Sequence, residues 1–415
     1  MEARGYIVRR AAPMYRLLHE TGEKTGAVRV RKASELTGKG VLVGYVDEGG
    51  DTSHPALPKE RIRDKRNFSG DGRLDSVEKE AVSHGTHGMG IVGGQAVPGG
   101  ALGELSPYVG MAPGVEFAIA KVLSATGGSE ATIMAGMEWA ASLVVNPLKT
   151  PVLLNLSLGG PGSSNSPVAR LANQLKLKNI GVIVAAGNSG PLEGTVSTPA
   201  HAALVTSIGA VDKDDKLTDY SSRGRKGTHQ IRRVNIGGAV FFDRPNLYDI
   251  VSALNTRLAK AFEESPSAVK WAGKTLYHAL SGTSMAAPHE TGQQAVLIER
   301  MMQVFTDGLP DGYLFWLDEL LDRTAKKLSG YGEHEIGAGR TDLEAALKAL
   351  DKALKNPDRV RGEAEELMAR AREEYGNPGE PPIETPGRFQ RPGISSVPST
   401  VASAVLAGLG LFLLP

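Results

Sequence analysis

One serine lies in a setting that could make its hydroxyl a nucleophile. Ser284 follows a Gly-Thr pair and precedes Met-Ala-Ala, small and apolar residues that begin a helical pattern. A serine oxygen reacts poorly at neutral pH unless a base takes its proton and a third group orients that base. His84, in the stretch Ser-His-Gly-Thr-His-Gly, and Asp47, at the end of an apolar run, are side chains of those two types. The three residues predict nucleophilic catalysis at Ser284.

The residues between these three predict strands that alternate with helices. The apolar run at 41–46 is typical of a parallel strand that is covered on both faces. Further strands are expected at 115–123, 152–156, 182–186 and 204–211, and helices at 131–145 and 168–177. This alternation predicts an α/β fold with a mostly parallel sheet and helices on both faces.

Each candidate residue lies at the end of a strand or at the start of a helix, where such a fold places its functional side chains. Asp47 and Asn188 follow the carboxyl ends of strands, where open parallel sheets bind their ligands. His84 begins a helix expected at 85–94, and Ser284 begins a long helix towards residue 304. We therefore expect these side chains to meet at one edge of the sheet.

Composition excludes some classes of function. The chain has 415 residues, 41% hydrophobic and 22% charged, with a formal net charge of +1. This charge gives no reason to expect nucleic acid as a partner. The chain has no cysteine, so disulfides, thiolate metal sites and a cysteine nucleophile are excluded.

The two ends of the chain differ. The first residues have no apolar segment, so a signal peptide is not expected. Residues 394–415 carry no charge, and 401–414 are nearly all apolar, close to the roughly 20 residues that span a bilayer. We expect membrane contact through 397–414 and an otherwise cytoplasmic protein. The alternative is a tail helix packed on the protein or on another subunit.

From about residue 36 to about residue 340, the chain resembles the subtilisin-like serine proteases, or subtilases. The resemblance rests on separate blocks around Asp47, His84, Asn188 and Ser284. It implies a three-layer α/β fold and a serine endopeptidase. In that activity Ser284 would attack a peptide carbonyl, His84 would act as general base and acid, and Asp47 would orient His84. Asn188 would stabilise the oxyanion.

The resemblance also implies residues that bind an extended polypeptide substrate. One edge would comprise Ser124, Ala125, Thr126, Gly127 and Gly128, and the other Ser157, Leu158, Gly159, Gly160 and, beside Asn188, Gly187. No cofactor is required for the chemistry. Structural calcium is possible but cannot be assigned, because Ala56 stands where secreted relatives often have an aspartate.

The resemblance and the composition together suggest how the chain is divided. The expected parts are an N-terminal extension or short pro-segment (1–26), a catalytic domain (27–349) with an extended insertion (225–280), a helical extension (350–376), a Pro/Gly-rich linker (377–396) and a hydrophobic tail (397–415). The insertion contains a helix-like run at 248–264. Helices are expected at 343–354 and 363–375. The extension could block the substrate cleft.

Several alternatives stay open. His87 could form a metal pair with His84, but the Glu found between the histidines of zinc protease helices is missing, so a core histidine is favoured. Asp51 competes with Asp47, and Ser281 with Ser284. A second function is a catalytically silent subtilase fold that binds peptides or serves as a membrane-tethered assembly module.

The chain departs from the family pattern in three places. Glu48 follows Asp47 where Thr or Ser is common, and the residues after His87 are Gly-Met-Gly instead of Val-Ala-Gly. Glu290 stands in a helix that is normally buried, so we expect it to have a polar partner or an exposed face.

Overall fold

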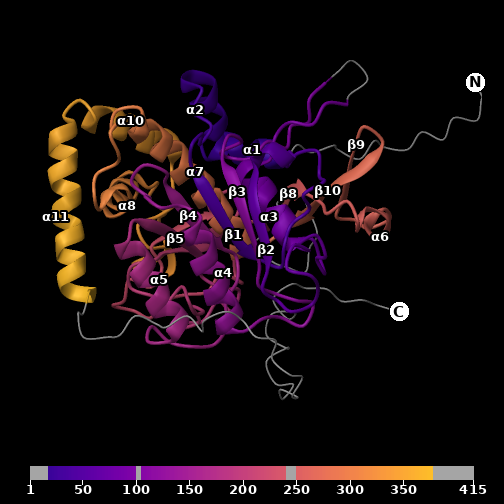
Figure 1. Cartoon of the computed structure of the whole chain (residues 1–415), viewed down its shortest axis with the longest axis horizontal. Helices are drawn as coiled ribbons and strands as arrows, with labels where there is room; N and C mark the ends of the chain where they lie inside the picture. Colours follow the sequence, from indigo (N-terminus) through magenta and orange to yellow (C-terminus); the bar gives the residue numbers. More distant parts are fainter. Residues whose placement is uncertain (1–16, 100–103, 240–248, 377–415) are drawn as a thin grey trace, which may run out of the picture.

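The computed structural model describes residues 17–99, 104–239 and 249–376 (Figure 1). Its centre is a seven-stranded, fully parallel sheet with the strand order β2-β3-β1-β4-β5-β6-β7. The strands are β1 (Leu42–Asp47), β2 (Ile62–Asn67), β3 (Glu116–Lys121), β4 (Val152–Leu156), β5 (Ile180–Ala185), β6 (Thr206–Val211) and β7 (Arg233–Ile236). The predicted α/β fold with a mostly parallel sheet is confirmed.

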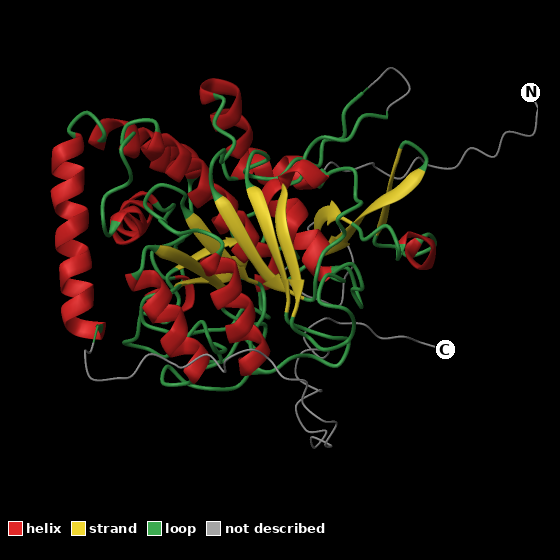
Figure 2. Cartoon of the chain, viewed as in Figure 1, coloured by secondary structure: helices red, strands yellow, loops and turns green. Residues whose placement is uncertain are grey.

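Helices cover both faces of this sheet (Figure 2). On one face lie α3 (His84–Gly93) and α7 (Thr283–Met302), and on the other α4 (Glu130–Ser142) and α5 (Pro167–Leu177). Strand β1 shows how the faces are separated, because neighbouring side chains of a strand point in opposite directions. Gly44 faces α4, where an added Cβ would lie 2.9 Å from the Cβ of Ala140, while Tyr45 faces α3.

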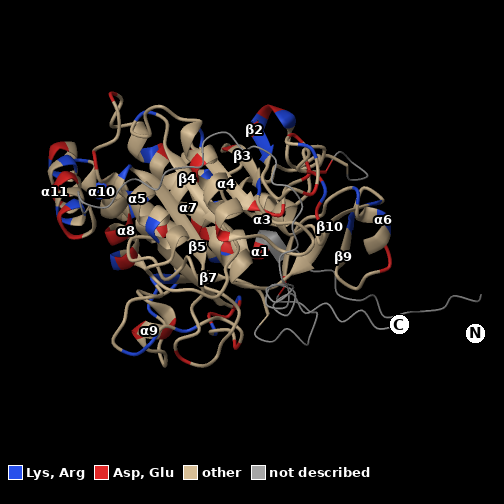
Figure 3. Ribbon diagram, turned by 60° about the horizontal axis from the view of Figure 1, so that its bottom comes forward, with Lys and Arg blue, Asp and Glu red and all other residues tan. Residues whose placement is uncertain are grey.

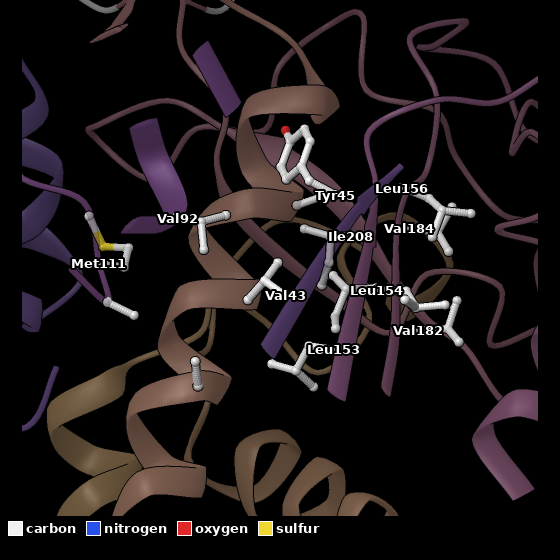
Figure 4. Packing of buried hydrophobic residues seen from close by; sticks show 14 of the residues in the cluster. Val43, Tyr45, Val92, Met111, Leu153, Leu154, Leu156, Val182, Val184 and Ile208 are labelled. Carbon is white, nitrogen blue, oxygen red and sulfur yellow. The ribbon is translucent and has the colours of Figure 1, made fainter. Parts of the chain in front are cut away.

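The apolar core is continuous from β1 through β6. Figure 4 shows Val43 and Tyr45 of β1 on the same side of the sheet as Val92 of α3, whereas Leu154 and Val184 lie towards the other face. All five side chains are fully buried. Because β1, β4 and β5 are covered on both faces, their residues are mostly apolar, although β4 contains Asn155.

Strand β2 was not predicted, and its composition explains why. It is an edge strand of the sheet, and four of its six residues are Arg, Lys or Asp (Figure 3). Charged side chains protect an edge strand from pairing with other chains. They also remove the apolar pattern by which a strand is recognised.

The prediction of a helix at 248–264 was wrong. Residue 248 lies outside the described residues, β8 (Ile250–Ala253) is a strand, and only α6 (Ala259–Phe262) is helical. β8 pairs antiparallel with β10 (Lys274–Leu280), which also pairs with β9 (Ala268–Trp271). Only Ala272 and Gly273 separate β9 from β10, whereas α6 and β9 lie between β8 and β10, so a local pattern does not reveal the pairing of β8 with β10.

Four described helices follow α7, and those that Figure 1 labels lie on the opposite side of the molecule from the β8–β10 sheet. The four helices are α8 (Tyr313–Thr324), the short α9 (Glu333–Ile336), α10 (Leu343–Ala353) and α11 (Pro357–Tyr375). Helix α11 begins six residues before the predicted start at 363, because Pro357 occupies its first turn and the Asn356 side chain accepts a hydrogen bond from the Arg359 N–H.

Part of the expected N-terminal extension packs on the domain. Helices α1 (Leu17–Lys24) and α2 (Ala27–Ser34) contact each other, and α1 also contacts β8. Thr21 and Thr25 are fully buried, and the Thr25 carbonyl accepts a hydrogen bond from the Leu343 N–H at 3.1 Å. Whether the extension regulates access to the cleft stays a prediction, since residues 1–16 lie outside the described part.

No helix among the described residues is long and apolar enough to cross a membrane. The predicted linker (377–396) and hydrophobic tail (397–415) lie outside the described residues, so membrane contact through 397–414 stays a prediction.

Candidate active site

The Asp47–His84 pair forms the buried centre of the site. The imidazole Nδ1 of His84 lies 2.9 Å and 3.1 Å from the two carboxylate oxygens of Asp47. Asp47 is fully buried at the end of β1, and His84, the first residue of α3, is 8% exposed. This contact sets the tautomer of the ring, because Nδ1 must carry the hydrogen atom that it donates in the hydrogen bond to the Asp47 carboxylate. The other ring nitrogen, Nε2, is then free to act as a base.

The charges around His84 favour its protonated form. Burial alone would lower the pKa of His84, but the negative charges of Asp47, Glu48 and Glu80, with the hydrogen bond to Asp47, outweigh burial and raise it to about 9. An imidazolium that forms during a reaction would therefore be strongly stabilised here.

Ser284 is the second residue of α7 and is held mainly by Ser157. The Ser157 hydroxyl donates to the Ser284 carbonyl at 2.9 Å. That carbonyl needs an outside donor because Pro288, four residues later, has no N–H to complete the helical hydrogen bond. The Asn155 amide donates to the Ser157 hydroxyl at 2.9 Å, and the Thr291 hydroxyl donates in turn to the Asn155 amide oxygen at 2.8 Å.

The Ser284 hydroxyl itself donates to the main-chain carbonyl oxygen of Ser157, at 3.1 Å. Within the described residues no hydrogen bond joins it to His84, so the expected contact between Ser284 and His84 is not formed in this structure. Such links are often long without substrate and tighten in the reacting complex.

Asn188, which follows β5, is oriented by the residue before Ser284. Its side-chain oxygen accepts from both the N–H and the hydroxyl of Thr283, each at 2.9 Å. The amide nitrogen is therefore the group left to donate. It lies near the start of α7, where a Cβ added to Gly282 would be 3.4 Å away. This places an N–H donor beside the positive end of the helix dipole. The role of Thr283 was not predicted.

The predicted substrate segments differ in their relation to Ser284. Ser157, as described, contacts Ser284, and Gly187 donates its N–H to the Thr283 hydroxyl at 3.2 Å. Gly160 exchanges two main-chain hydrogen bonds with Thr198, at 2.9 Å and 3.0 Å. Leu158 is buried and Gly159 is partly exposed beside it.

The segment 124–128 forms a tight turn after β3. Ser124 and Gly127 exchange main-chain hydrogen bonds of 2.9 Å and 3.0 Å, and Gly127 has a φ of 95° that suits glycine. Ala125, Thr126 and Gly128 are exposed. Among the described residues, no hydrogen bond joins this turn to Ser284, Asn188 or Ser157.

The nearby histidine does not form a metal site with His84. His87 is fully buried, its Nε2 lies 2.9 Å from the Ile250 carbonyl oxygen, and its ring packs edge-on against His278. In the described part of the chain there is no group of three or more His, Asp or Glu side chains that could hold a metal ion. Asp51 binds Ser53 and Thr256 instead of a catalytic side chain.

Glu290 has the polar partner that its sequence position requires. It is fully buried in α7, and its carboxylate lies 2.7 Å from the guanidinium of Arg233 on β7, which is also fully buried. Asp318 of α8 lies 2.7 Å from the same Arg233 nitrogen. The carboxylates around Arg233 hold the pKa of its guanidinium well above its usual value although burial opposes this. Breaking such a pair would leave a buried charge without compensation.

Comparison with known proteins gives one consistent result. A model described as the subtilase family matches residues 38–339. The chain is 28% identical to the major intracellular serine protease of Bacillus subtilis (strain 168) over 329 residues, which are 75% of this chain and 88% of that protein. It is 29% identical to subtilisin DY of Bacillus licheniformis over 273 residues, covering 65% and 80%.

A solved structure described as a lanthipeptide protease has a similar fold. It matches with a TM-score of 0.62 and 20% sequence identity, covering 81% of this chain and 95% of that chain. At this identity the similarity concerns the fold alone.

Proposed function

Because the chain belongs to the subtilase family and is a serine endopeptidase, we propose that it cleaves polypeptides through an acyl-enzyme on Ser284. The observation that carries this assignment is the buried Asp47–His84 hydrogen bond at the carboxyl end of β1. This hydrogen bond orients the imidazole, and the negative charge of Asp47 stabilises the imidazolium that forms when the ring accepts a proton.

In the proposed reaction the Ser284 hydroxyl transfers its proton to His84 Nε2 while its oxygen attacks the peptide carbonyl carbon. The negative oxygen that results accepts hydrogen bonds from the Asn188 amide and from the Ser284 N–H. His84 then gives its proton to the leaving amine. Water, activated by the same imidazole, hydrolyses the acyl-enzyme and restores Ser284.

The nucleophile is tested by covalent labelling with a fluorophosphonate probe together with cleavage of an unstructured polypeptide. Ser284→Ala is expected to abolish labelling and to reduce turnover by about 10⁶, the size of the effect that loss of the nucleophile has in subtilisin. The fold should persist, since within the described residues the hydroxyl makes a single hydrogen bond, to the Ser157 carbonyl.

Ser281→Ala is the matched control for this test. The Ser281 hydroxyl bonds to the Asp249 carboxylate and accepts from the Ala239 N–H at 2.8 Å, so we assign it a structural role. Labelling should survive this change. Labelling lost in Ser281→Ala but kept in Ser284→Ala would reverse the assignment. A wild-type chain that neither labels nor cleaves would favour the catalytically silent peptide-binding module.

A further inference from the structure

Helix α3, which carries His84, begins without a cap of its own. The first N–H groups of any helix need partners from outside the helix. Ser83 stands at the capping position, but its φ of 65° is in the left-handed region, which is uncommon for residues other than glycine. Its hydroxyl accepts a hydrogen bond from the Asn255 N–H at 2.7 Å instead of capping α3.

Two buried glutamates take the place of the cap. The Glu48 carboxylate accepts from the His84 N–H at 2.7 Å and from the Ala81 N–H at 3.1 Å. The Glu80 carboxylate accepts from the Thr86 N–H at 2.7 Å. Glu48 is 6% exposed and Glu80 is 7% exposed. Carboxylates at this end of a helix are stabilised by the helix dipole.

Glu48 is itself fixed by the sheet. Its N–H donates to the Asp47 carboxylate at 2.7 Å, and its carbonyl accepts from the buried Lys121 ammonium at 2.8 Å. Lys121 ends β3 and pairs in register with Asp47 on β1. His84 is therefore held at two points by two consecutive residues, at its ring by Asp47 and at its main chain by Glu48.

We propose that Glu48 is a positioning residue for His84: its carboxylate holds the turn that presents His84, and its charge sets the pH at which His84 can accept a proton from Ser284. This inference rests on the proposed function, in which His84 is the general base. The proposal assigns a function to Glu48, which stands where Thr or Ser is common in the family.

The charges around His84 come from several elements. Asp47 and Glu48 face it from the end of β1, Glu80 from the preceding loop, His87 from α3 itself and His278 from β10. The Lys121 ammonium lies beside the Glu48 carbonyl.

The carboxylates around His84 favour its imidazolium form. His87 and His278 are buried, which lowers the pKa of each, so both are neutral near pH 7. The negative charge of Glu48 favours the imidazolium, although burial raises the pKa of Glu48 too. Removing that charge should make His84 a free base at lower pH.

The charge is tested by Glu48→Gln, which keeps the size of the side chain. In the Ser284→Ala background, the NMR titration of the His84 ring should have a midpoint about 0.5–1 pH unit lower than without the Glu48 change. In the active enzyme, the acid limb of kcat/KM against pH should move down by the same amount. An unmoved ring titration would overturn the proposed effect of the charge.

The contact of the Glu48 carboxylate with the turn that precedes His84 is tested by Glu48→Asp, which keeps the charge on a shorter side chain. It should reduce the plateau of kcat/KM several-fold while the midpoint of the acid limb stays near the wild-type value. Should Glu48→Gln not fold, this variant decides, and a wild-type plateau would overturn the proposal.

Glu78→Gln is the matched control. Glu78 lies on the same loop as Glu80 but pairs with Lys65, away from His84, so neither the ring titration nor the acid limb should move. The NMR titration does not depend on turnover. A chain without peptidase activity would therefore refute the proposed function while the ring titration still decides the role of Glu48.

Discussion

Asn188 is the residue whose contribution to catalysis can be isolated most cleanly. Thr283 occupies its side-chain oxygen with two hydrogen bonds, so the amide nitrogen is committed to one direction. This geometry is set before any substrate arrives. Preorganised donors of this kind stabilise a developing oxyanion without any cost of reorganisation during the reaction.

We predict that Asn188→Leu lowers kcat by about 10²–10³, equivalent to roughly 2.7–4 kcal/mol of transition-state stabilisation. KM should change little, since the amide is proposed to act on the oxyanion and not on the bound peptide. Steady-state kinetics on a peptide substrate would measure both constants, and thermal unfolding would check the fold. An unchanged kcat would remove Asn188 from the oxyanion site.

At the scale of elements, α3 packs against β1 through a close contact between Gly88 and the Tyr45 side chain. Gly88 stands one turn after His84, and a Cβ built on it would lie 1.6 Å from the Tyr45 hydroxyl oxygen. The phenol of Tyr45 therefore fills the space that a side chain at residue 88 would need. This explains the glycine that departs from the family pattern after His87.

We predict that Gly88→Val destabilises the protein by about 1–3 kcal/mol or more, because it overpacks this contact. Combining it with Tyr45→Val should recover part of the loss, so that the two changes are not additive. Chemical unfolding in the Ser284→Ala background would give the free energies. Gly362→Val is the control, since nothing lies within 4 Å of a Cβ at that position of α11, and it should change stability by no more than about 0.5 kcal/mol. Strict additivity at residues 45 and 88 would contradict the proposed fit.

The β8–β10 sheet connects the two catalytic helices. The Ser252 hydroxyl donates to the His87 carbonyl at 2.8 Å, which attaches β8 to α3. β8 pairs with β10, and β10 ends four residues before Ser284. The predicted insertion thus contains strands that join the proposed base and nucleophile, in addition to the more peripheral α6.

At the scale of the whole molecule, buried histidines set the stability in acid. Burial lowers the pKa of His278 to about 3 and of His289 to about 4, and it also lowers the pKa of His87. The unfolded chain binds these protons below about pH 6.5, whereas the folded chain does not. The stability from these groups is present above that pH and is lost as the pH falls towards 4.

Two groups of the active site act in the opposite direction. The pKa of His84 is raised to about 9, and burial with the neighbouring Glu48 raises that of Glu80 to about 8. Their folded forms hold protons that the unfolded chain releases at lower pH, so stability falls as the pH rises through these values.

We therefore predict that the melting temperature of Ser284→Ala, which cannot digest itself, is highest at about pH 6–7 and falls on both sides. Differential scanning calorimetry from pH 4 to pH 9 would measure it at constant ionic strength. A melting temperature that rises steadily up to pH 9 would show that His84 and Glu80 do not retain their protons in the folded chain.

The residue types and their neighbours in the sequence were enough to predict several strands and the family of this protein. The apolar run at 41–46 predicted a strand covered on both faces, the segments 152–156 and 182–186 predicted two further strands, and the blocks around Asp47, His84 and Ser284 identified the family. Such signals are local, because burial on both faces and the start of a helix each leave a pattern within a few residues.

Only the tertiary structure decided which distant groups touch. The contacts of Glu48 with the start of α3, of Tyr45 with Gly88 and of Arg233 with Glu290 each join residues that lie far apart in the sequence. The pairing of β8 with β10 is non-local in the same way. A single sequence records the members of such pairs but not their contact, because each contact exists only after the sheet and its two layers of helices have packed.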